Sequence, residues 1–96
     1  MTRDEALQRL RDAKSSLAAF PIRALALFGS VARNEATPES DIDVLVEFSA
    51  PVGLLEFVRL KRQLEAVLEA PVDLVTPGAL RAEFRDRILR ECISAS

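Results

Sequence analysis

The sequence contains no histidine and only one cysteine, Cys92. The lack of histidine excludes a His-based catalytic triad, a histidine general base and any zinc site with a histidine ligand. One cysteine cannot form an internal disulfide or a cysteine-cluster metal site, so we expect a cytoplasmic, reducing location. Any chemistry must therefore use carboxylates, hydroxyl groups and cations. The hard oxygen atoms of aspartate and glutamate favour Mg²⁺ or Mn²⁺ over zinc or copper.

Tryptophan and tyrosine are also absent, and the net charge is −2. Proteins that bind DNA or RNA without sequence preference are usually basic and stack aromatic rings on bases, so we expect no direct nucleic-acid partner. No apolar run approaches the length of about eighteen residues that a membrane span needs, and the N-terminus lacks an apolar signal segment. The three glycines lie too far apart for a P-loop or a dinucleotide-binding fingerprint.

The composition and length of the chain are those of one globular domain. It has 96 residues, of which 49% are apolar and 29% charged, with both signs mixed. Apolar periodicity and turn residues predict helices over 2–19, over most of 51–70 and over 78–93, strands over 22–28, 41–48 and 71–77, and a short helix that begins at Gly29. This order predicts an α/β domain with a small three-stranded mixed sheet flanked by about four helices.

The C-terminal region is predicted to pack as a helix and then to fray. The apolar residues of 78–93 recur at helical spacing and predict a stripe that faces the core, formed by Leu80, Phe84, Ile88 and Cys92. Cys92 on such a stripe is expected to be a small buried apolar group rather than a reactive thiol. The polar tail, residues 94–96, is expected to fray.

Chemistry is concentrated where the first predicted strand ends and the second begins. Gly29 and Ser30 follow the apolar run 22–28, and Asp41 and Asp43 open the run 41–48. Two acids one residue apart on a strand share a face, with Cα atoms about 6.6 Å apart, and repel each other unless a cation lies between them. A Gly-Ser turn leaves room for a phosphate beside the backbone. Together these features indicate phosphoryl or nucleotidyl transfer.

Each of these residues also has a purely structural interpretation. Gly29 and Ser30 alone would be a plain turn, and Asp41 alone would be a turn or capping acid. Asp43 is harder to explain in that way, because an acid between Ile42 and Val44 costs several kcal/mol to bury unless it is paired or binds metal. If the third predicted strand neighbours the second, it lies about 4.8 Å away, and Asp73 could then join Asp41 and Asp43 in one cluster. The alternative is that Asp73 is an edge-strand acid that faces water.

Three cations have open roles. Arg33 either binds phosphate through a charge-assisted hydrogen bond or pairs with the neighbouring Glu35. Arg59 and Lys61 lie on the predicted long helix, where a solvated charged face is the simpler interpretation. Either could still approach a nucleotide, and the sequence does not choose between them.

The string Phe28-Gly29-Ser30-Val31-Ala32-Arg33, followed by Ser40-Asp41-Ile42-Asp43, resembles the signature of the DNA polymerase beta-like nucleotidyltransferase superfamily. It is most similar to the minimal nucleotidyltransferases, many of which are antitoxins of HEPN-type toxins. Residues 72–77 also match the third strand of that family, so the resemblance covers nearly the whole chain. The family often has glycine where this chain has Asn34, a mild departure because asparagine tolerates a left-handed backbone.

The resemblance implies specific roles and partners. Asp41, Asp43 and Asp73 would be the catalytic acids and would hold two Mg²⁺ ions, and Gly29, Ser30 and Arg33 would bind the nucleotide. The substrate would be ATP, and AMP would be transferred to a hydroxyl of a protein partner, a HEPN-type ribonuclease toxin that forms a hetero-oligomer with the enzyme. The alternatives are a non-catalytic antitoxin that masks its partner by binding, and a nucleotidyltransferase that acts on a small molecule.

Overall fold

The elements follow one another in the predicted order along the chain. A computed structural model describes residues 1–95, and its elements are α1 (Arg3–Asp12), α2 (Lys14–Leu17), β1 (Ile22–Phe28), α3 (Gly29–Ala32), β2 (Ile42–Phe48), α4 (Leu54–Leu68), β3 (Val72–Val75), the 3₁₀ helix η1 (Pro77–Ala79), α5 (Ala82–Glu91) and β4 (Ile93–Ser94). The predicted α/β class is confirmed. None of the helices in the described part of the chain is long and apolar enough to cross a membrane.

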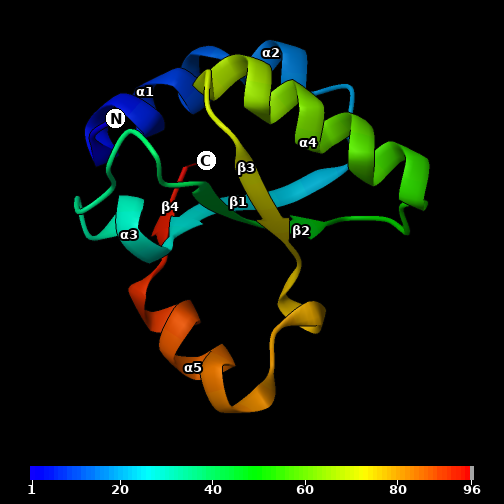
Figure 1. The fold of residues 1–96 in the computed structure, drawn as a ribbon. Helices are drawn as coiled ribbons and strands as arrows, with labels where there is room; N and C mark the ends of the chain where they lie inside the picture. The colour runs from blue at the N-terminus through cyan, green and yellow to red at the C-terminus, as the bar shows by residue number, and fades with distance from the viewer. Residues whose placement is uncertain (96) are drawn as a thin grey trace.

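The strands form one mixed sheet in the order β3-β2-β1-β4 (Figure 1). β1 is antiparallel to β2 and to β4, and β2 is parallel to β3. The sheet therefore has four strands rather than the predicted three. The additional strand, β4, is only two residues long and too short to leave a periodic signal in the sequence.

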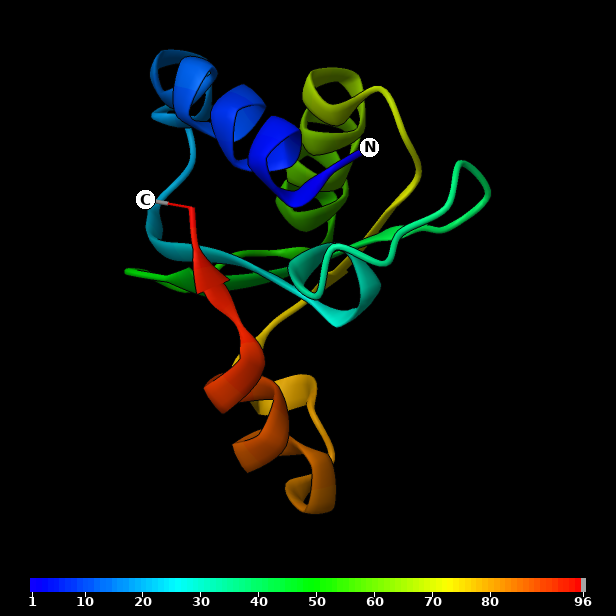
Figure 2. The same ribbon diagram turned by 90° about the vertical axis from the view of Figure 1, so that its left-hand side faces the viewer.

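One face of the sheet is covered by α1, α2 and α4, and the core lies between these layers (Figure 2). Strand alternation directs Leu25 and Leu27 of β1 toward the helices. The largest fully buried side chains from the other elements are Leu10, Val31, Ile42, Val44, Val46, Leu60, Leu64 and Leu68. The opposite face of β2 and β3, which carries Asp43 and Asp73, is left free of these helices.

The predicted helix over 2–19 is in fact two helices. It begins as expected, since the Thr2 hydroxyl accepts a hydrogen bond from the Glu5 amide at 3.1 Å. It breaks at Ala13, whose carbonyl oxygen accepts a hydrogen bond from the Ser16 hydroxyl. Serine competes for backbone groups in this way, which weakens the helix at the end that precedes Pro21.

The prediction for the C-terminal region was wrong in two respects. No residue of α5 is buried, and the exposed fractions of Phe84 and Leu89 are 47% and 42%, because α5 lies beyond the sheet from the other helices. Residues 94 and 95 do not fray. Ser94 belongs to β4, and Ala95 is 5% exposed and donates its amide to the Leu25 carbonyl at 2.8 Å. Ser96 lies outside the described residues.

Candidate active site

Asp43 and Asp73 are neighbours across the sheet. They are register partners in the parallel ladder between β2 and β3, so their side chains lie on the same face, opposite the helical layer. Asp43 is half-buried and Asp73 is exposed. Asp41 is also exposed and lies immediately before β2 rather than within it. The crossover through α4 thus brings together two acids thirty residues apart in the sequence.

Gly29 lies against the Asp43 carboxylate. Phe28 at the end of β1 is the register partner of Asp43, and the chain then turns at Gly29 with φ +69°. A Cβ atom at this position would lie 3.0 Å from Cγ of Asp43 and even closer to one of its carboxylate oxygens. Glycine is therefore required twice over, by the left-handed backbone and by the approach of the acid. The short helix α3 begins at Gly29, as predicted, with Ser30 in its first turn.

Arg33, which directly follows α3, forms ion pairs with two glutamates. Its Nε donates to Oε2 of Glu35 at 3.2 Å, and its Nη1 lies 3.7 Å from Oε2 of Glu91 on α5. The pairing with Glu35 is the structural alternative that the sequence left open. The contact with Glu91, which sequence reasoning missed, depends on where α5 packs, and no local pattern in the sequence signals it.

The acids and Arg33 share one electrostatic environment. Burial raises the pKa of Asp43 above its ordinary value, the carboxylates of Asp73 and Asp41 raise it further, and Arg33 opposes them. Asp73 and Asp41 are therefore each near enough to disfavour the negatively charged form of Asp43. The site has an excess of negative charge that a bound cation would relieve.

This excess predicts that Asp43→Asn stabilises the protein at neutral pH. Because the folded-state pKa is raised above 3.8, the folded protein binds more protons than the unfolded chain as pH rises from 3.8 to the folded-state pKa. Stability therefore falls through that window and stays lower above it. We expect the variant to melt a few degrees higher than the parent at pH 7, with the difference closing as pH falls toward 3.8.

Melting curves between pH 3.5 and 8 would check this stabilisation. Glu39→Gln is the matched control, since Glu39 is an exposed loop acid that loses the same charge. If the two substitutions shift the melting temperature equally, net charge rather than the local cluster is responsible.

The donor chemistry of the site fits Mg²⁺, because Asp41, Asp43 and Asp73 offer carboxylate oxygens and surplus negative charge. As the side chains stand, no group of three or more acidic or cysteine side chains within residues 1–95 forms a metal-binding set. The pair Asp43 and Asp73 is thus the nucleus of the candidate site. Arg59 and Lys61 lie on α4, across the sheet from Asp43, so the structure places neither among these residues.

Comparison with known protein families and sequences gives one consistent result. A family model described as a nucleotidyltransferase domain matches residues 7–95. A candidate protein adenylyltransferase of Methanocaldococcus jannaschii, MJ0435, is 46% identical over 72 residues, which cover 75% of this chain and 77% of that protein. Protein adenylyltransferase MntA of Thermococcus cleftensis is 40% identical over 74 residues, which cover 77% of this chain and 75% of that protein.

Solved structures agree with the sequence comparisons. The structure of a candidate minimal nucleotidyltransferase matches with a TM-score of 0.83 and 38% identity. The match covers 97% of this chain and 95% of the other chain. The crystal structure of a toxin–antitoxin with AMP-PNP matches with a TM-score of 0.70 and 20% identity. The match covers 100% of this chain and 73% of the other chain. The structure of a tri-AMPylated Shewanella oneidensis HEPN toxin in complex with MNT antitoxin matches with a TM-score of 0.67 and 17% identity. The match covers 95% of this chain and 71% of the other chain. At such identities the last two show a shared fold.

Proposed function

This chain belongs to the nucleotidyltransferase domain family and is a nucleotidyltransferase enzyme, and we propose that it transfers AMP from ATP to a hydroxyl group of a protein partner. The observation that supports this most directly is the pairing of Asp43 with Asp73 beside Gly29. The partner proposed is a HEPN-type ribonuclease toxin, which AMP would silence, so that the enzyme acts as its antitoxin within a hetero-oligomer. The name of the Thermococcus cleftensis relative and the AMPylated HEPN toxin complexed with MNT antitoxin support this choice.

Nucleotide binding is assigned to the corner around α3. Gly29 and Ser30 would cradle the β- and γ-phosphates with backbone N–H groups and the serine hydroxyl. Arg33 is exposed, and within residues 1–95 its ion-pair partners are the carboxylates of Glu35 and Glu91, which lie at the surface and are weak partners. It would exchange one of them for a phosphate oxygen, a charge-assisted bond of greater strength.

The transfer step is assigned to the acids. Asp41, Asp43 and Asp73 would hold Mg²⁺, which neutralises triphosphate charge and polarises the reacting oxygens. The acceptor oxygen would bond to the α-phosphorus as the bond from that phosphorus to pyrophosphate breaks, and the proton of the hydroxyl would pass to Asp73. Asp73 suits this role because its side chain is exposed and could be reached by an acceptor hydroxyl.

Intact-mass spectrometry tests the proposal. We expect the partner to gain one or more adenylyl groups when it is incubated with this chain, ATP and Mg²⁺. It should gain none when EDTA is added, or when ATP is replaced by α,β-methylene-ATP, in which the bond from the α-phosphorus to the leaving group cannot break. Parallel reactions with GTP, CTP and UTP would identify the donor base. A partner whose mass stays unchanged in the complete reaction, although it co-purifies with this chain, would contradict the proposed transfer.

A further inference from the structure

α5 lies on the open side of the sheet, apart from the layer of α1, α2 and α4 (Figure 2). No residue of α5 is buried. Among residues 1–95, one ion pair joins α5 to the rest of the chain, and it connects Glu91, the last residue of α5, with Arg33. Oε2 of Glu91 lies 3.7 Å from Nη1 of Arg33. α5 is thus attached to the corner around α3 partly by a polar contact that a competing anion can break.

Of the two glutamates that contact Arg33, Glu91 is the one that Arg33 can give up more easily. Glu35 belongs to the same turn of the chain, since its amide donates to the Ser30 carbonyl at 2.8 Å and its carboxylate accepts from Nε of Arg33 at 3.2 Å. The contact of Arg33 with Glu91 is longer, and Oε1 of Glu91 also lies 3.2 Å from Nε of Arg87. The charge of Glu91 therefore keeps a partner when Arg33 leaves it.

Arg33 also lies at the corner where the triphosphate is proposed to bind. Its amide donates to the Gly29 carbonyl at 3.2 Å, and Gly29 lies against the Asp43 carboxylate. The carboxylate of Glu91 thus adds a negative charge beside a site that is proposed to receive a polyanion. Because like charges repel, and because a guanidinium bonds more strongly to phosphate than to an exposed carboxylate, the triphosphate would displace Glu91 from Arg33.

We infer that Glu91 competes with the triphosphate of ATP for Arg33, so that ATP binding and release of α5 from the α3 corner are linked. This inference rests on the proposed function, because it takes Arg33 as a ligand of the nucleotide. The linkage is reciprocal: a change that weakens the pair strengthens ATP binding, and bound ATP weakens the attachment of α5. Since exposed ion pairs are weak, the expected coupling is about two- to fivefold in affinity.

Calorimetric titration with α,β-methylene-ATP and Mg²⁺, without any partner, tests the competition at Glu91. We expect Glu91→Gln to bind this nucleotide about two- to fivefold more tightly than the parent. Asp86→Asn, which removes the same charge from an exposed position on a different face of α5, should leave the affinity unchanged.

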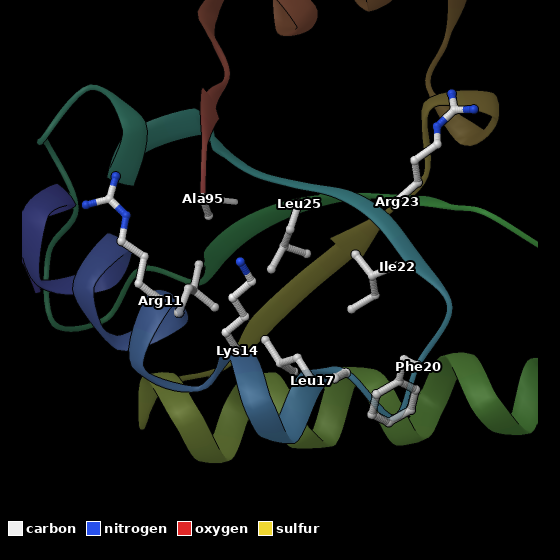
Figure 3. A pocket seen from close by; sticks show the side chains of 10 residues that line it. Arg11, Lys14, Leu17, Phe20, Ile22, Arg23, Leu25 and Ala95 are labelled. Carbon is white, nitrogen blue, oxygen red and sulfur yellow. The ribbon is translucent and has the colours of Figure 1, made fainter.

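Arg33→Ala should bind the nucleotide about tenfold more weakly, and adding Glu91→Gln to it should then change nothing, since the competition needs the guanidinium. Arg11→Ala is the matched control for the loss of an exposed arginine. Arg11 lines a groove of about 670 Å³ on the helical side of the sheet (Figure 3), so its loss should not alter the affinity.

Hydrogen exchange gives a second measurement of the release of α5. A helix of ten residues is marginal on its own, so the amides of 82–91 should exchange faster when the nucleotide is bound to the parent. In Glu91→Gln the nucleotide should change this exchange little.

Two results would overturn the inference and leave Arg33 as a nucleotide ligand: unchanged or weaker affinity in Glu91→Gln, or slower exchange in α5 when the nucleotide binds. An Arg33→Ala variant that binds like the parent would overturn the inference together with the proposed role of Arg33. Neither measurement involves AMP transfer to a partner, so failure of the proposed reaction would be seen separately.

Discussion

Replacing Asp41 and Asp43 together by asparagine should lower the rate of AMP transfer by about 10³-fold or more while the protein stays folded and bound to its partner. Asparagine keeps the shape of each side chain and removes the negative charge that would hold Mg²⁺. Folding should not suffer, because burial and the carboxylates of Asp73 and Asp41 already raise the pKa of Asp43 and so disfavour its charged form. The variant thus removes negative charges that promote AMP transfer but lower the stability of the folded protein.

This double variant also separates the enzyme from the alternative of an antitoxin that masks its partner. Three readouts are needed: adenylyl mass on the partner, co-purification of the two proteins, and growth of cells that produce the toxin. Loss of transfer and of neutralisation with an intact complex supports the enzyme. Full neutralisation without transfer would mean that contact alone silences the partner. Glu39→Gln with Asp86→Asn makes the same charge change at two exposed acids and should be neutral in all three.

The parts of the fold that sequence reasoning placed correctly have short-range causes. The β1–α3 junction could be predicted because an apolar run meets a glycine, and the left-handed backbone at Asn34, with φ 60°, agrees with the tolerance expected of asparagine there. The parts placed wrongly have long-range causes. An amphipathic pattern shows that α5 has an apolar side, but not that Phe84 and Leu89 would be left exposed on it. Likewise, Ser94 is part of a strand because it pairs with Ala26 of β1, and the local sequence does not signal that pairing.

The candidate site divides in the same way. The spacing of Asp41 and Asp43 indicated a shared function, but whether Asp73 would join them depended on the parallel register of β2 and β3, which no local pattern fixes. The contact of Arg33 with Glu91 was also out of reach, because it needs two segments that lie far apart in the sequence to meet. Sequence spacing thus indicated the acids, while topology decided their neighbours.

Gly29→Ala should reduce AMP transfer by about a hundredfold, although it adds a single methyl group outside the set of acids. A non-glycine residue at φ +69° costs about 1–2 kcal/mol of stability, which a domain of this size can bear. The larger effect is on geometry. The new Cβ would collide with the Asp43 carboxylate, and with Cγ of Asp43 at 3.0 Å the side chain must rotate away from the corner where the triphosphate is proposed to lie. An acid misplaced by about 1 Å can cost such a factor in rate.

Gly78→Ala is the matched control for this substitution, because a Cβ at Gly78 meets no atom within 4 Å. Transfer rates and melting temperatures of both variants should be measured together, and Gly29→Ala should lose far more activity than its stability loss explains. Combining Gly29→Ala with Asp43→Asn should then cost little more activity than Asp43→Asn alone, since the glycine acts through that carboxylate. Additive losses in the combined variant would instead mean that the added methyl group disturbs the nucleotide site independently of Asp43, and that its collision with the Asp43 carboxylate is incidental.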